Sequence, residues 1–226
     1  MTRPARQIRV RNALGDPAAL PVGMNPVLRR VLLGRGVSSE KELSLGLRDM
    51  QGPATLQGIA QAAEMLADAV CSDRKILIVG DFDADGATGT ALAVLSLQAM
   101  GATRVDFRVP NRFEFGYGLT PALVETLSDD PPDLLLTVDS GISCLDGVEM
   151  ARGLGCEVIV TDHHLPGKTL PSANAIVNPN QPGDAFPSKA LAGVGVMFYL
   201  LGTTRSVLRE RGWFGAGRAE PNLAQF

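Results

Sequence analysis

The chain has 226 residues, of which 45% are hydrophobic and 20% are charged, and its formal net charge at neutral pH is −3. This composition predicts a folded domain with a substantial core and excludes global disorder. The small negative charge provides no general attraction for nucleic acid, so any surface that binds it must be local.

Two features limit the setting in which the protein works. Its three cysteines form no CxxC pair, which is typical of reduced thiols in a cytoplasmic protein. No apolar run reaches the roughly 18 residues of a membrane-spanning helix, and the arginine-rich N-terminus lacks the apolar segment of a secretory signal. We therefore expect a cytoplasmic protein.

Taken in order, the chain begins with an irregular region and continues with a regular one. Residues 1–54 are predicted to form an N-terminal arm and short helices, one of them capped by Ser38 or Ser39. Residues 57–70 have apolar side chains at helical spacing and predict a helix. Strand and helix patterns then alternate as far as residue 214. Residues 215–226 show neither pattern and are predicted to form an irregular tail.

Five short segments are predicted to be strands: residues 76–80, 105–109, 134–138, 157–161 and 175–177. Helices are expected over residues 87–100, 121–127, 145–154 and 188–211, with Thr120 as an N-cap and with Gly193 and Gly195 as candidate break points in the last helix. Continuous apolar strands that alternate with helices are typical of parallel sheets. The predicted fold class is therefore α/β, a mostly parallel sheet with helices on both faces.

Acids and histidines follow three of the predicted strands. They are Asp81, Asp83 and Asp85 after the first, Asp139 after the third, and Asp162, His163 and His164 after the fourth. The carboxyl ends of parallel strands lie at one edge of the sheet, where ligands bind. A solvated acidic loop or helix capping explains each aspartate singly. The presence of acids after three different strands, with both histidines after one of them, favours a shared site.

Carboxylate and imidazole ligands suit Mn²⁺ or Mg²⁺, and no cysteine joins them to favour zinc. A single ion that keeps open coordination positions needs fewer than seven side chains. The seven candidates therefore indicate two ions close together. Such sites hydrolyse phosphoryl bonds, because one ion activates a water and the other stabilises the leaving oxygen. Asp139, on a middle strand, is the expected bridging ligand.

Several segments resemble the DHH phosphoesterase family, named after its Asp-His-His run. In the family's order they are GDFDADGATG, TVDSGIS, VTDHHLPG and IVNPNQPG. The segments PNRFEFGYGLT and FPSKALAGVGVMFYLL resemble the bacterial single-strand-specific 5′→3′ DNA exonucleases of this family. The resemblance covers residues 55–214 and implies a Mn²⁺- or Mg²⁺-dependent phosphodiesterase acting on single-stranded DNA in repair and recombination. A single-strand-binding protein and a helicase are the implied protein partners.

The resemblance also implies roles for individual residues. Asp83, Asp85, Asp139 and His163 match metal ligands, and Asp81 is either a ligand or a support. His164, Asp162 and Asp139 are the expected catalytic residues, with His164 facing the scissile phosphate and Asp162 orienting the histidines. Arg112 is the expected phosphate clamp. The rings of Phe113, Phe115 and Tyr117 could stack on bases or pack in the core.

One departure from the resemblance concerns the end of the sequence. Family members of this kind continue into a segment with a further metal-binding aspartate and a second domain that closes a cleft, and nothing after Trp213 resembles either. We therefore expect a truncated form with weak or no activity alone. The alternatives are a phosphodiesterase for short oligonucleotides, cyclic dinucleotides or pyrophosphate, and a non-catalytic scaffold or DNA-binding fragment.

Overall fold

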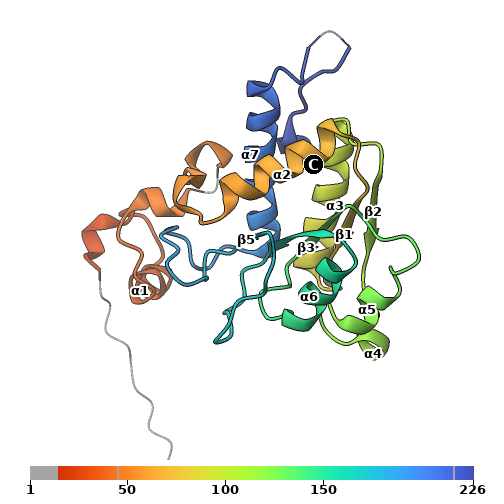
Figure 1. Ribbon diagram of the computed structural model, residues 1–226. Coiled ribbons are helices and arrows are strands. Elements are labelled where there is room, and N and C mark those ends of the chain that lie inside the picture. The colour runs from red at the N-terminus through yellow and green to blue at the C-terminus, as the bar shows by residue number, and fades with distance from the viewer. Residues whose placement is uncertain (1–14, 45, 216) are drawn as a thin grey trace, which may run out of the picture. The chain divides into compact units, whose positions relative to one another are not determined.

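The computed structural model describes residues 15–44, 46–215 and 217–226, and the chain divides after Gln51 into two compact units (Figure 1). The first unit contains helix α1 (Pro26–Gly34) and 3₁₀ turns at Pro17–Ala19, Glu40–Leu43 and Leu47–Asp49. The arm expected at residues 1–14 lies outside the described residues. None of the described helices has the length and apolar character needed to cross a membrane.

The predicted serine cap in the first unit is only partly correct. Ser39 occupies the N-cap position of the 3₁₀ turn Glu40–Leu43, but its side chain accepts no hydrogen bond from the turn's backbone. The hydroxyls of Ser38 and Ser39 instead donate to the carboxylate of Glu42, at 2.7 and 3.1 Å. The serines therefore contact the turn through the side chain of Glu42 and not through the free backbone N–H groups of the turn.

The second unit is built on a five-stranded sheet. Its strands are β1 (Ile76–Val79), β2 (Val105–Arg108), β3 (Leu134–Val138), β4 (Glu157–Thr161) and β5 (Ala175–Val177). They lie in the order β2-β1-β3-β4-β5, and every neighbouring pair is parallel. The central strands are buried, which explains their continuous apolar sequences. The predicted parallel α/β fold is confirmed.

Helices cover both faces of this sheet, as predicted (Figure 1). Alternate strand residues such as Leu77 and Leu135 pack with α5 (Pro121–Glu125) and α6 (Leu145–Gly153) in one core. On the other face α7 (Gly193–Glu210) packs against both α2 (Ile59–Cys71) and α3 (Ala84–Ala99), and all three helices contact the sheet. Because side chains alternate along a strand, each strand supplies both cores.

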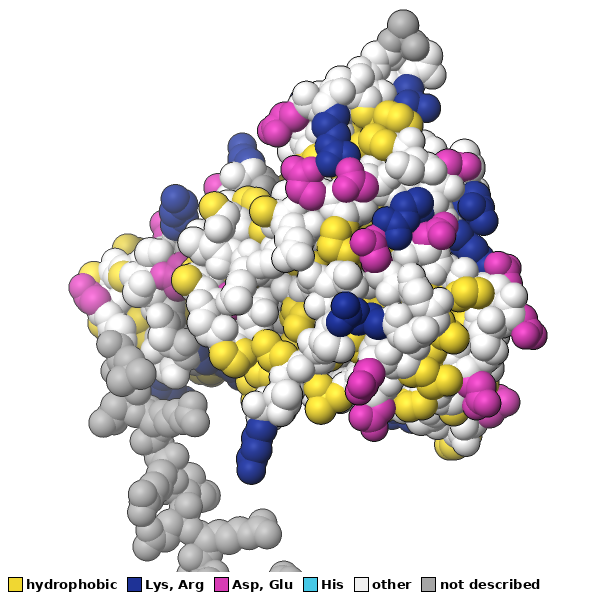
Figure 2. Space-filling view, in the orientation of Figure 1, with side chains coloured by type: hydrophobic (Ala, Val, Ile, Leu, Met, Phe, Trp, Pro, Cys, Tyr) yellow, Lys and Arg dark blue, Asp and Glu magenta, His cyan; other side chains and the backbone are white. Residues whose placement is uncertain are grey.

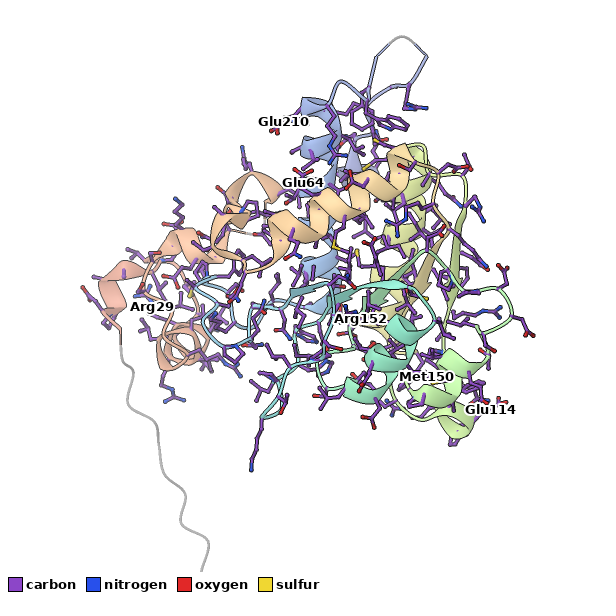
Figure 3. The ribbon with its side chains drawn as sticks, viewed as in Figure 1. Arg29, Glu64, Glu114, Met150, Arg152 and Glu210 are labelled. Atoms are coloured by element: carbon purple, nitrogen blue, oxygen red, sulfur yellow. The ribbon has the colours of Figure 1, made fainter. Side chains whose placement is uncertain are left out.

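Ion pairs reinforce this helical layer at its surface. Glu64, labelled on α2 in Figure 3, pairs with Arg211, which follows α7, and Arg211 also reaches Asp68 at 2.7 Å. Elsewhere on the face shown in Figure 2, basic and acidic side chains are interspersed. This mixed surface agrees with the small net charge of the chain.

The structure corrects two predicted helix starts and adds two short elements. Helix α3 begins at Ala84 and not at residue 87, because Asp83 is its N-cap. Residues 188–192 are not helical, and α7 begins at Gly193 and continues through Gly195. The segment after β2, where no helix was predicted, contains the one-turn helix α4 (Arg112–Phe115). The tail contains a 3₁₀ turn at Leu223–Gln225.

Candidate metal centre

The candidate site lies at the carboxyl ends of β1, β3 and β4, where the sequence placed it. Carboxylate oxygens of Asp81, Asp83 and Asp139 lie within 4.8 Å of one another. A ligand atom of Asp139 also lies within 4.8 Å of ligand nitrogens of His163 and His164. Asp139 is thus common to both groups, on the middle strand of the three. Its bridging role stays a prediction.

Asp139 has a buried carboxylate whose negative charge the protein compensates incompletely. The residue is only 1% exposed. Its Oδ1 atom accepts no hydrogen bond, although Nε2 of His163 lies 3.0 Å away. Burial, and then the charges of Asp85 and Asp83, raise the pKa of Asp139 to about 7. A positive φ of 60° adds backbone strain, because only glycine adopts this region freely. A bound cation would compensate this charge.

Asp162 is equally buried but is fully compensated by hydrogen bonds. Its Oδ1 atom accepts from the backbone N–H groups of His163 and His164 and lies 2.7 Å from Nδ1 of His164. Its Oδ2 atom accepts from the N–H of Ile142 at 2.9 Å. Asp162 therefore holds the turn and orients the His164 ring, which fits its expected supporting role.

The three aspartates after β1 have three different surroundings. Asp81 is buried, and its Oδ1 atom accepts from the N–H of Phe82 at 2.8 Å. Asp83 is exposed and caps α3 by accepting from the N–H groups of Asp85 and Gly86. The hydrogen bond from Gly86 holds the pKa of Asp83 below its usual value. Asp81 and Asp83 therefore present negative charge toward Asp139.

Asp85 has a structural partner that its sequence position does not indicate. Its two carboxylate oxygens accept from the N–H groups of Gly193 and Val194, at 2.6 and 2.8 Å. These groups are the free donors at the start of α7, so Asp85 binds α7 to α3. Nε2 of His163 lies 3.8 Å from its Oδ2 atom. The expected role of Asp85 as a metal ligand stays a prediction.

Gly193 is a site residue that the sequence indicated only as a helix break. A Cβ atom built at this position would lie 2.4 Å from Oδ1 of Asp139. Any side chain here would therefore displace the carboxylate that both ligand groups share. The absence of a side chain allows the start of α7 to approach the site.

The two histidines are held through their backbone as well as their rings. The side-chain amide of Asn180 donates to the carbonyl of His163 at 2.6 Å, and that of Asn178 donates to the carbonyl of His164 at 3.0 Å. Burial lowers the pKa of His164, but the hydrogen bond and charge of Asp162 outweigh it and raise that pKa overall. Both asparagines lie in the IVNPNQPG segment, which indicated the family but assigned them no role.

Arg112 and Tyr117 reach the site from the segment between β2 and α5. The guanidinium carbon of Arg112 lies 3.9 Å from the ring centroid of Phe82 and 5.6 Å from that of Tyr117. The Tyr117 hydroxyl donates to the backbone carbonyl of Asp139 at 3.3 Å, and its ring meets His164 edge-on. Burial, and then nearby carboxylates led by Asp162, raise the pKa of Tyr117, so it stays a neutral donor.

The other two aromatic residues of this segment differ. Phe113 is fully exposed, so the expected alternative of core packing is wrong for it. Phe115 is partly buried and packs against the core beneath α5 and α6. Of these two rings, that of Phe113 is therefore the one free for contact with another molecule.

The fold and the site define a parallel α/β domain with aspartates and histidines suited to divalent cations at the carboxyl edge of its sheet. The model of the "DHH family, N-terminal domain" matches residues 75–217, and the chain belongs to this family.

Curated relatives extend this finding to a particular group. The chain is 50% identical over 222 residues to the single-stranded-DNA-specific exonuclease RecJ of Escherichia coli K12, covering 97% of this chain and 38% of that protein. It is 54% identical over 207 residues to the RecJ of Dickeya dadantii, covering 91% of this chain and 36% of that protein. The chain thus spans less than two fifths of the length of these relatives.

Solved structures agree with the sequence comparison. A crystal structure of exonuclease RecJ bound to manganese has 38% identity and a TM-score of 0.62, over 74% of this chain and 40% of that one. The structure of RecJ from Thermus thermophilus in complex with Mn²⁺ has 35% identity and a TM-score of 0.63, over 79% of this chain and 24% of that one.

Proposed function

We propose that this chain carries the metal-binding part of a single-stranded-DNA-specific exonuclease of the RecJ type. Such an enzyme hydrolyses phosphodiester bonds from the 5′ end, and we propose a role in DNA repair and recombination. The observation that carries the proposal is the buried, incompletely compensated carboxylate of Asp139, surrounded by Asp81, Asp83 and His163. The names of the RecJ relatives support the substrate class.

The proposed cofactor is Mn²⁺ or Mg²⁺, with two ions in the complete enzyme. The donor set fits, because hard carboxylate oxygens and imidazole nitrogens converge on Oδ1 of Asp139, which accepts no hydrogen bond. We propose Asp81, Asp83, Asp85, Asp139 and His163 as the residues that hold the metal. When bound, the ions would supply an activated water and charge stabilisation at the leaving oxygen.

The chain's own side chains would orient the substrate and supply positive charge. Asp162 fixes His164 through Nδ1 at 2.7 Å and raises its pKa, so His164 carries more positive charge near neutral pH than an ordinary histidine. We propose that His164 faces the scissile phosphate. Arg112 would bind a phosphate through its fork of donors. Tyr117 holds the backbone carbonyl of Asp139 and could contact a base or sugar.

We further propose that the 226-residue chain alone binds metal but cleaves DNA weakly or not at all. The family resemblance implies a further carboxylate and a closing domain, and the chain spans only 36–38% of its curated relatives. In the cell, a single-strand-binding protein and a helicase are the proposed partners, and the cytoplasm is the proposed location.

The metal proposal is tested by titrating the chain with Mn²⁺ in a calorimeter. The wild type should bind, whereas Asp139→Ala and His163→Ala should lose most of the binding heat while remaining folded by circular dichroism. Unchanged binding in both variants would overturn the proposed centre.

A substrate panel tests the reaction. Long single-stranded DNA, duplex DNA, dinucleotides, cyclic dinucleotides and pyrophosphate are each incubated with the chain and Mn²⁺. Slow release of nucleotides from single-stranded DNA alone, abolished in Asp139→Ala, would support the exonuclease. Faster hydrolysis of the small substrates would instead favour a small-molecule phosphodiesterase. Binding of DNA without any hydrolysis would indicate a DNA-binding fragment.

A further inference from the structure

We propose that Phe82 is a positioning residue, which holds the guanidinium of Arg112 at the metal-binding edge so that it can receive a phosphate of the DNA strand. The inference rests on the proposed function and deepens it, because it concerns how the same site would bind its substrate. Phe82 lies between Asp81 and Asp83, where the sequence pattern directs attention to the acids alone.

The geometry of the contact is that of a cation–π interaction. The guanidinium carbon of Arg112 lies 3.9 Å from the centroid of the Phe82 ring, well within the range of about 6 Å over which such contacts attract. Tyr117 offers a second ring, but its centroid is 5.6 Å away. Phe82 is therefore the closer of the two supports.

The ring of Phe82 is in an unusual position for a phenylalanine. The residue is 50% exposed, although it directly follows residues 76–81, which are all buried. Its neighbours Asp81 and Asp83 both belong to the group of converging ligand atoms. The same stretch of backbone therefore carries two candidate metal ligands and the Phe82 ring. Through this ring, Arg112 contacts the turn that holds Asp81 and Asp83.

Arg112 has no competing partner that would neutralise it. Among the described residues, its guanidinium donates no hydrogen bond and forms no ion pair, although aspartates follow three nearby strands. It contacts only the two rings there. A ring face attracts the cation without using its N–H groups, which lie in the guanidinium plane. The five donors of Arg112 thus remain free for phosphate oxygens.

The second unit offers a matched control for Phe82. Phe107, on the edge strand β2, is 51% exposed, and its N–H donates to Oδ1 of the preceding Asp106 at 2.8 Å. Phe82 makes the same local bond to Asp81 at the same distance. No cation–π contact is found at Phe107 among the described residues. Replacing either ring therefore removes a similar exposed surface, but only one replacement releases an arginine.

The test measures binding of a phosphorothioate single-stranded oligonucleotide, labelled at its 3′ end, by fluorescence anisotropy in Mn²⁺. Phe82→Leu should weaken binding about 2- to 5-fold, as expected for an exposed cation–π contact. Phe82→Trp should retain or improve binding because it keeps a ring face, and Phe107→Leu should match the wild type. Calorimetry should show unchanged Mn²⁺ affinity in Phe82→Leu.

A double-mutant cycle shows whether Phe82 acts through Arg112. In an Arg112→Ala background, Phe82→Leu should cause no further loss of binding. An equal loss in both backgrounds, normal binding by Phe82→Leu, or reduced Mn²⁺ affinity in that variant would each overturn the inference while leaving the proposed function intact. If the wild-type chain binds Mn²⁺ but not the oligonucleotide, the DNA substrate and the inference both fail.

Discussion

Asp139 and Asp162 follow the neighbouring strands β3 and β4, and each is only 1% exposed, yet the protein compensates their charges very differently. Asp162 receives three backbone hydrogen bonds and one contact from the ring of His164. Asp139 retains an oxygen with no hydrogen bond, and its burial, followed by the charges of neighbouring carboxylates, raises its pKa.

The difference shows that burial alone does not identify a functional carboxylate. A buried charge is costly unless hydrogen bonds or an opposite charge compensate it. At Asp162 the protein supplies the compensation, so the residue stabilises the metal-free fold. At Asp139 the compensation is incomplete, so the residue favours a ligand that brings positive charge.

The largest expected effect is the loss of stability in Asp162→Ala. This change leaves the buried N–H of Ile142, among others, without an acceptor, and should destabilise the metal-free protein by about 3–5 kcal/mol. Urea unfolding in EDTA measures the effect. A loss below about 1 kcal/mol would show that Asp162 does not organise the turn.

Asp139→Asn should have the opposite profile. The metal-free protein should be as stable as the wild type or more so, since the change removes a poorly compensated charge. Mn²⁺ affinity by calorimetry should fall at least about 100-fold, because even losing an outer-shell partner of a metal ligand costs about 10–100-fold. The comparison with Asp162 fails if this variant unfolds in EDTA but keeps its affinity for Mn²⁺.

The pH dependence of stability sharpens the same comparison. The folded-state pKa of Asp139 is raised to about 7 from an ordinary value of 3.8, so between these pH values the folded state binds more protons than the unfolded state. The contribution of Asp139 to stability therefore falls as the pH rises through this window. In EDTA, Asp139→Asn should gain stability over the wild type at pH 8 and differ little at pH 4. An equal difference at both pH values would contradict the assigned pKa.

The smallest expected effect concerns Asp85, which binds the start of α7. Asp85→Ala should destabilise the metal-free protein by about 1 kcal/mol, typical for a lost helix cap. Asp85→Asn should cost less, since its amide oxygen can still accept one of the two bonds. We expect both variants to weaken Mn²⁺ binding less than Asp139→Asn does. A larger loss would make Asp85 primarily a metal ligand.

Much of the fold and the general position of the site were predictable from local sequence. Apolar runs predicted β1, β3, β4 and β5 because buried parallel strands need apolar side chains on both faces. The edge strand β2 was also predicted, although its residues are mostly exposed. The position of Asp139 and Asp162 directly after such runs then placed them at one edge of the sheet. Boundaries at turns were less accurate, as at α3, where Asp83 caps a helix that begins earlier than expected.

The contacts that distinguish the site residues could not be predicted this way. Asp85 accepts hydrogen bonds from residues more than 100 positions away, and Arg112 lies over a ring from a different segment. No periodicity or spacing indicates such pairs, because they depend on how separate helices and loops pack around the sheet.

The sequence by itself determined the parallel α/β fold and the edge at which acids and histidines gather, because strand burial and residue order are local properties. Only the tertiary structure decided which of these acids are compensated. Asp139 and Asp162 have the same residue type, the same burial and the same position after a strand. Their difference arises from the number of N–H donors that neighbouring turns bring within about 3 Å, the distance at which a hydrogen bond can compensate a buried charge.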